Sequence, residues 1–142
     1  MLQLQETLDK IAAIIDTYEG LSEDFSSPYF IQQLRDKLSA YAVYLGTFEA
    51  EFRKDFNAAE HTYKVAKLSE RLKNRKGGMS IADAESEAEL AVQAQHAIYL
   101  DQEHGYFQVR NMIEQVNKVL DSMSSRLRII MSEDGSSQKS LS

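Results

Sequence analysis

The chain has 142 residues with one proline, six glycines and no cysteine, and its formal net charge is -6 at pH 7. The lack of cysteine excludes disulfides, thiolate zinc sites and cysteine nucleophiles, and the negative charge disfavours a protein that coats nucleic acid over its whole surface. No apolar run approaches the roughly 20 residues of a membrane-spanning helix, and the first residues lack the pattern of a signal peptide. We therefore expect a cytoplasmic protein with no membrane association.

The first element is an amphipathic helix within residues 1–20. Its apolar residues recur at spacings of three and four, which places them on one helix face. Gly20 is expected to end this helix, and the polar stretch 21–28 forms a connector. Ser27 and Pro28 then provide a typical helix start, because serine caps free amides and proline suits the first helical turn. The apolar positions of the first helix are Leu4, Leu8, Ile11, Ile15 and Tyr18.

A second helix is predicted over residues 29–76 and a third over residues 81–131. The paired glycines Gly77 and Gly78 separate them, and Ser80 is placed to cap the third helix. The apolar stripe of the third helix repeats about every 3.5 residues, as in a coiled coil. The tail 132–142 is rich in serine and has little to bury, so we expect it to be disordered. Each of these helices is interrupted by few helix-breaking residues.

These elements predict an all-α fold: a long antiparallel, coiled-coil-like helical hairpin with a short N-terminal helix. Two helices cover only one stripe of each other, and the first helix is too short to cover the rest. We expect several chains to associate into an oligomeric bundle, with a monomer in which the first helix folds back as the alternative.

The most prominent charged feature is a basic run at the end of the second helix. It contains six cations and one acid, Glu70, between residues 64 and 76. One interpretation is a stripe that follows the phosphates of a nucleic acid. The other is a charge match across the hairpin with the acids that begin the third helix, Asp83, Glu85, Glu87 and Glu89. The candidate nucleic-acid contacts are Lys64, Lys67, Arg71, Lys73, Arg75, Lys76 and, near the end of the third helix, Arg126 and Arg128.

The histidines suggest a metal site only weakly. Antiparallel pairing could bring His61 close to His96, and Asp101 with His104 has the spacing of half of a di-iron motif. The second Glu-x-x-His pair that such a site needs is missing, so no metal ligand and no cofactor is predicted. No phosphate loop, nucleophile elbow or carboxylate pair is present either, and we expect no catalytic residue and no enzymatic activity.

The chain resembles the small helical recombination mediators of T-even-type phages, the UvsY family. The resemblance rests on the size of the chain and on the segment Asn57-Ala-Ala-Glu-His-Thr-Tyr-Lys-Val-Ala-Lys, which leads into a basic turn. It also rests on the last-helix segment Val119-Leu-Asp-Ser-Met-Ser-Ser-Arg-Leu-Arg-Ile-Ile. The resemblance implies an oligomer that binds single-stranded DNA and works with a recombinase and a single-strand binding protein. Under it, Lys64, Lys67, Arg71 and Arg75 would contact phosphates.

Three other functions remain open from the sequence. The first is a structural or adaptor coiled coil whose exposed apolar stripe binds a partner helix. The second is an acidic inhibitor that occupies the nucleic-acid site of another protein through residues 83–103. The third is a metal-dependent helical bundle enzyme.

Overall fold

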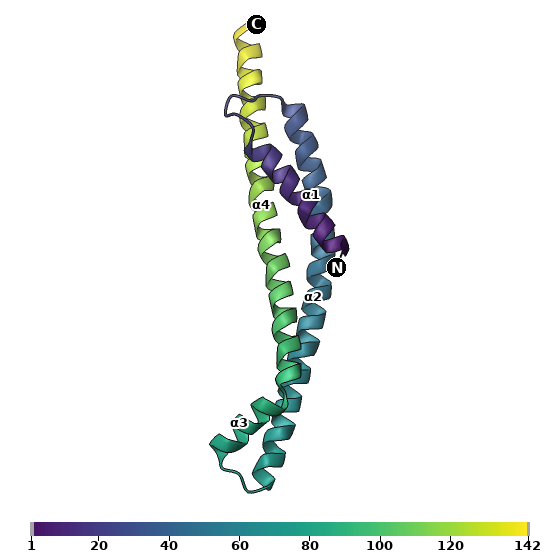
Figure 1. Ribbon diagram of the computed structural model, residues 1–142. Coiled ribbons are helices and arrows are strands. Elements are labelled where there is room, and N and C mark those ends of the chain that lie inside the picture. The colour runs from purple at the N-terminus through teal and green to yellow at the C-terminus, as the bar shows by residue number, and fades with distance from the viewer. Residues whose placement is uncertain (1, 142) are drawn as a thin grey trace. The chain divides into compact units, whose positions relative to one another are not determined.

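The computed structural model describes residues 2–141, with side chains described for residues 3–133. Over that range the chain forms four helices and no strand (Figure 1). The all-α prediction and the helical hairpin are confirmed, with α1 close to the helix expected within residues 1–20 and α2 close to that expected over 29–76. The helices are α1 (Leu2–Glu19), α2 (Pro28–Lys76), α3 (Ile81–Ala91) and α4 (Gln93–Leu141).

The chain divides into two compact units, and α2 and α4 each contribute to both. Unit 1 comprises Met1–Phe48 with Arg110–Ser142, and unit 2 comprises Glu49–Val109. Unit 1 therefore contains α1, the first part of α2 and the last part of α4. Unit 2 contains the rest of α2, the whole of α3 and the start of α4. None of the helices, over the described residues, is apolar enough along a sufficient length to cross a bilayer.

The core of unit 1 is formed by one apolar stripe from each of its three helices. Every apolar position predicted on the first helix is buried, and Ile11 has no exposed surface. Because residues three and four apart share a helix face, each helix can turn one stripe inwards and keep its charged residues in water. The other helices of unit 1 contribute Ile31, Leu34, Leu38 and Leu45 from α2 and Val116, Met123, Leu127 and Ile130 from α4.

Arg126 holds the connector between α1 and α2. Its guanidinium donates hydrogen bonds to the backbone carbonyls of Ser22 and Phe25 and lies over the ring of Tyr18, 5.9 Å from the ring centroid. At the end of the connector the amide of Phe30 donates to Ser27 Oγ at 3.5 Å, the cap expected from the sequence. The connector is thus fixed by one arginine at one end and a helix cap at the other.

The turn between α2 and α3 uses the paired glycines as expected. Gly78 has φ of +93°, a conformation that side chains with a Cβ rarely adopt. Ser80 caps α3, because its side chain accepts a hydrogen bond of 3.2 Å from the amide of Asp83. Asn74 adds a bond of 3.3 Å from its Nδ2 to the carbonyl of Ala84, which ties the two helices together beside the turn.

The prediction of one continuous helix from 81 to 131 is wrong at Val92. The backbone there has φ -110° and ψ +21°, far from the helical ψ near -42°, so α3 ends and α4 begins (Figure 1). The Val92 amide still donates to Ala88, and the His96 amide donates to the Val92 carbonyl, so the break costs few hydrogen bonds. It leaves the Val92 side chain almost fully buried. Valine tolerates the break because its β-branched side chain is a modest helix former.

The helix end predicted near residue 131 is also wrong, because α4 continues to Leu141. Residues 132–141 contain no proline and one glycine, and extending an existing helix adds a hydrogen bond for each residue that is fixed. The disorder predicted for 132–142 therefore does not hold for the backbone as far as 141. Residue 142, and the side chains after Glu133, lie outside the described part of the chain.

Candidate functional site

Six of the predicted site residues lie on the last turns of α2, in unit 2. Two of these six form ion pairs with carboxylates of α3. Lys67 Nζ forms ion pairs with Glu85 at 2.8 Å and with Glu89 at 2.6 Å, and Arg71 Nη1 lies 3.4 Å from Glu85. The charge match between α2 and α3 that the sequence suggested is therefore present in the structure. Each ion pair lies at the protein surface, so its contribution is modest and depends on salt.

The ion pairs shift the titration of the groups that form them. Hydrogen bonds from Lys67 hold the pKa of Glu85 and that of Glu89 below the ordinary carboxyl value. The same two carboxylates raise the pKa of Lys67 above that of a free lysine. Lys67 and its two acids are thus charged together over the physiological range, as expected for a stable ion-pair cluster.

A stack of aromatic rings continues from this cluster along the seam between α2 and α4. The hydroxyl of Tyr63 donates to both carboxylate oxygens of Glu89, at 3.0 and 3.1 Å. The Tyr63 ring stacks on His96 with centroids 4.7 Å apart. Burial, followed by the contact with Glu89, raises the pKa of Tyr63. We call this series of rings the aromatic ladder; it alternates between α4 and α2 in the order His96, Tyr63, Tyr99, Phe56 and Tyr106.

Beyond the ladder, α2 and α4 approach each other closely at Gly105. A Cβ built on Gly105 would overlap the Phe52 ring, so any other residue at this position would require that ring to move. The sequence carried a signal for this contact, since a single glycine inside a predicted helix often marks a close approach of backbones. The sequence interpretation assigned Gly105 no role.

The predicted proximity of His61 and His96 is wrong. Tyr63 takes the position against His96, while His61 is exposed on another face of α2. Asp101 and His104 are both exposed on α4. Over the described residues, no group of three or more His, Cys, Asp or Glu side chains is arranged to hold a metal ion.

The remaining cations of the α2 run are more available to bind another molecule than Lys67 and Arg71. Lys64 pairs with Glu60 of the same helix at 2.7 Å, and Arg75 donates to the Met79 carbonyl at 2.8 Å. Lys73 and Lys76 form no ion pair with the part of the chain that the structure describes, and both are exposed. The basic surface at the end of α2 therefore rests mainly on Lys73 and Lys76.

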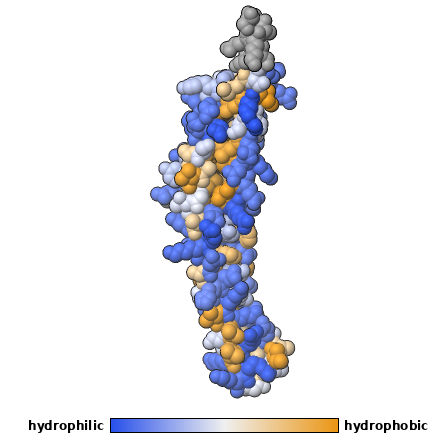
Figure 2. Space-filling view, turned by 180° about the vertical axis from the view of Figure 1, so that it is seen from behind, coloured by the Kyte–Doolittle hydropathy of each residue, from blue (hydrophilic) through white to orange (hydrophobic). Residues whose placement is uncertain are grey.

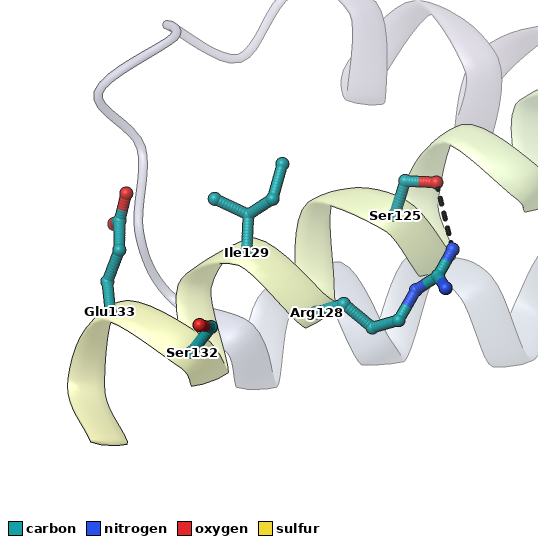
Figure 3. A pocket seen from close by; sticks show the side chains of 5 residues that line it. All are labelled: Ser125, Arg128, Ile129, Ser132 and Glu133. Carbon is teal, nitrogen blue, oxygen red and sulfur yellow. Dashed lines mark hydrogen bonds between the residues drawn. The ribbon is translucent and has the colours of Figure 1, made fainter. Parts of the chain in front are cut away.

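The two arginines predicted near the end of the last helix lie in unit 1, on α4. Arg126 is engaged with the connector carbonyls. Arg128 donates to Ser125 Oγ at 3.3 Å and lines a shallow hollow with Ile129, Ser132 and Glu133 (Figure 3). All of these hollow-lining side chains come from α4, so the hollow is a dip in one helix face rather than an enclosed pocket.

An apolar stripe on α2 was missed from the sequence. Val65, Leu68 and Leu72 are 52%, 46% and 53% exposed. Their spacing of three and four residues places them on one face, and this pattern was available in the sequence. We call Val65, Leu68 and Leu72 the outer stripe.

The outer stripe meets further apolar surface at the turn. Leu72 lines a small hollow with Ile81 of α3, and Arg71, Arg75 and Glu85 form the other walls. Ile81 is 72% exposed. Figure 2 shows apolar surface around this end of unit 2, at the bottom of the view, bordered by hydrophilic residues.

Comparison with known proteins gives no relative for this arrangement: no family model, no curated protein and no solved structure matches the chain.

Proposed function

We propose that this protein is a non-enzymatic, self-associating helical accessory protein that works by docking other macromolecules on its helix faces. The supporting observation is the amount of large apolar surface that each unit leaves in water. In unit 1 Val43 and Tyr44 are exposed, and in unit 2 Ile98, Leu100 and Phe107 are exposed. Contiguous exposed apolar surface on a soluble chain marks a surface that binds another molecule.

The self-association surface is assigned to one edge of α4. Leu100 and Phe107 are seven residues apart, and so lie on the same side of the helix two turns from each other. Each is 46% exposed. Burying this pair against another chain would remove apolar area from water at about 25 cal/mol per Å².

Light scattering on the full chain tests this assignment. We expect a mass that is a multiple of 16.2 kDa. Leu100→Glu/Phe107→Glu should reduce it towards a single chain. The matched control, Gln93→Glu/Gln108→Glu, adds the same charge to α4 but removes no apolar side chain, and should keep the oligomer. A wild-type mass of one chain at every micromolar concentration would remove self-association from the proposal.

Single-stranded DNA binding, with a recombinase and a single-strand binding protein as partners, is the second candidate. The observation that favours it is the exposure of Lys73 and Lys76 without an ion pair in the described part of the chain. Phosphate binding depends on such cations and weakens as salt rises. Lys67 and Arg71 would have to give up their carboxylate partners in order to take part.

Fluorescence anisotropy of a labelled single-stranded oligonucleotide tests the second candidate. Lys73→Glu/Lys76→Glu should abolish binding at low salt. Lys37→Glu/Lys118→Glu makes the same change in net charge on exposed lysines of unit 1 and should leave binding in place. If wild type leaves the anisotropy unchanged at low salt, DNA binding is excluded.

A further inference from the structure

The outer stripe faces away from the rest of unit 2. On α2, the side chains of Tyr63, Lys67 and Asn74 contact α3 and α4. Positions 65, 68 and 72 fall on the opposite side of a helix with 3.6 residues per turn. Val65 and Leu68 therefore lie away from these contacts, Leu72 borders the hollow that it shares with Ile81 of α3, and all three remain about half exposed.

The border of the outer stripe is rich in cations, and those on one of its two edges form no ion pair with the described residues. Between residues 61 and 76 the sole acidic residue is Glu70, which is half-buried and lies on the seam side, one turn from Lys67 and Asn74. On one edge lie Lys64, Arg71 and Arg75, of which Lys64 pairs with Glu60 and Arg71 with Glu85. On the other edge lie the exposed Lys73 and Lys76, which form no ion pair with the described residues.

Charge decides between the possible occupants. A second copy docking through the same stripe would place cations against cations, which disfavours that pairing. A nucleic acid would satisfy the cations but would gain little from valine and leucine, because bases bind single-strand sites by stacking on aromatic rings. Residues 64–76 of α2 contain no aromatic residue, and Tyr63, which precedes them, is stacked in the ladder on the seam side.

We infer that the outer stripe docks an amphipathic helix of a partner protein whose apolar stripe is bordered by aspartate and glutamate. Val65, Leu68 and Leu72 would form the apolar seam of a coiled-coil contact, and Lys73 and Lys76 would pair with the partner's acids. Such helix pairs use apolar residues at spacings of three and four with opposite charges beside them. This inference rests on the proposed docking function and names the chemistry of one partner.

The experiment uses the full chain and a labelled synthetic helix of about four heptads, with leucine at the seam positions and glutamate beside them. A second peptide carries lysine in place of glutamate. Anisotropy should show binding of the acidic peptide and not of the basic one, with weakening as salt rises. Leu68→Ser/Leu72→Ser should weaken binding by about a hundredfold, about tenfold for each leucine whose apolar contact is lost.

The matched control is Ile129→Ser/Met131→Ser, which removes two exposed apolar side chains from the part of α4 in unit 1 and should leave peptide affinity unchanged. Circular dichroism checks that each variant remains helical.

The inference is overturned if the acidic peptide does not bind, or if it binds Leu68→Ser/Leu72→Ser as tightly as wild type. It is also overturned if Leu68→Ser/Leu72→Ser lowers the oligomer mass, since a second copy would then occupy the stripe. Loss of an oligonucleotide's binding in this variant would assign the stripe to nucleic acid instead. The Leu100→Glu/Phe107→Glu mass measurement reports separately on the proposed function.

Discussion

Gly105 offers the most direct test of how α2 and α4 pack in unit 2. A Cβ at this position would overlap Cε1 of the Phe52 ring and lie 2.9 Å from Cδ1, well inside van der Waals contact. In a helix interior, replacing glycine with alanine normally stabilises by roughly 0.5–1 kcal/mol, because alanine loses less backbone entropy on folding. At Gly105 this gain is opposed by the overlap with Phe52.

The overlap with Phe52 decides whether Gly105→Ala raises or lowers the free energy of unfolding. Adding a methyl group to a packed site costs about 1–3 kcal/mol when the neighbours must move. We expect Gly105→Ala to lower the free energy of unfolding by about 1 kcal/mol, after the propensity gain is subtracted from the steric cost. In a Phe52→Leu background the ring is absent, and the same substitution should stabilise. The double-mutant cycle should therefore show a coupling of at least about 1 kcal/mol.

Urea denaturation, monitored by circular dichroism, measures the effect of Gly105→Ala on the free energy of unfolding in the wild-type and Phe52→Leu backgrounds. Gly46 supplies the matched control, because it lies inside α2 as Gly105 lies inside α4, and a Cβ at Gly46 would meet nothing within 4 Å. Gly46→Ala should stabilise by roughly 0.5–1 kcal/mol. If Gly105→Ala stabilises as much as Gly46→Ala in the wild-type background, the close approach of α2 and α4 at Phe52 is refuted.

Three further predictions concern the ion pairs and hydrogen bonds. Lys67→Met should lower Tm by a few degrees at neutral pH. Lys67 holds the pKa of Glu85 and that of Glu89 below the ordinary 4.5. The stability that these two carboxylates contribute is therefore fully present above pH 4.5 and is lost as the pH falls through their folded pKa values. The difference in Tm between wild type and Lys67→Met should accordingly shrink below about pH 4, and a difference independent of pH would contradict the ion pairs. Gln95→Met should stabilise by about 1 kcal/mol in urea denaturation, since Gln95 Oε1 is buried with no hydrogen-bond partner among the described residues. Arg126→Lys should speed amide hydrogen exchange in residues 21–27, and unchanged protection there would show that the arginine does not hold the connector.

Periodicity predicted the core of unit 1 well because apolar burial there is strong and regular. Ile11 lies on the stripe predicted for the first helix and has no exposed surface, and Ile31, Leu38 and Met123, at helical spacing on α2 and α4, have none either. When three helices each bury one stripe, the spacing of three and four residues is sufficient to identify the core.

The same reasoning was less successful in unit 2, where few large apolar residues are buried. Ala84, Ala88 and Val92 supply its fully buried side chains near the turn, and the rest of the seam is aromatic or charged. The break at Val92 depends on a local backbone conformation in which the neighbouring hydrogen bonds are kept, and no proline or glycine marks it in the sequence. A pattern of residue types does not encode that conformation.

The role of the cations was not available from the sequence because a lysine on a helix can pair inside the chain or outside it. Lys67 and Lys73 belong to the same basic run, yet the register of α3 places two acids against Lys67 and none against Lys73. The structure thereby divides the run into residues that join α2 to α3 and residues that form no ion pair with the described part of the chain.

Unit 2 also reverses the usual distribution of side chains on α2. Tyrosine, lysine and asparagine face the other helices, where they bond through Tyr63, Lys67 and Asn74, while valine and leucine face water at the outer stripe. Hydrophobic burial drives folding, so leaving these aliphatic residues outside forgoes stability that the chain could have gained by exchanging the two faces. The outer stripe forgoes this stability and has cations on both edges. Burial of its apolar residues by a partner would explain why the chain keeps them exposed. On this reasoning, Leu68→Ser/Leu72→Ser should leave the stability of the isolated chain nearly unchanged while it removes peptide binding.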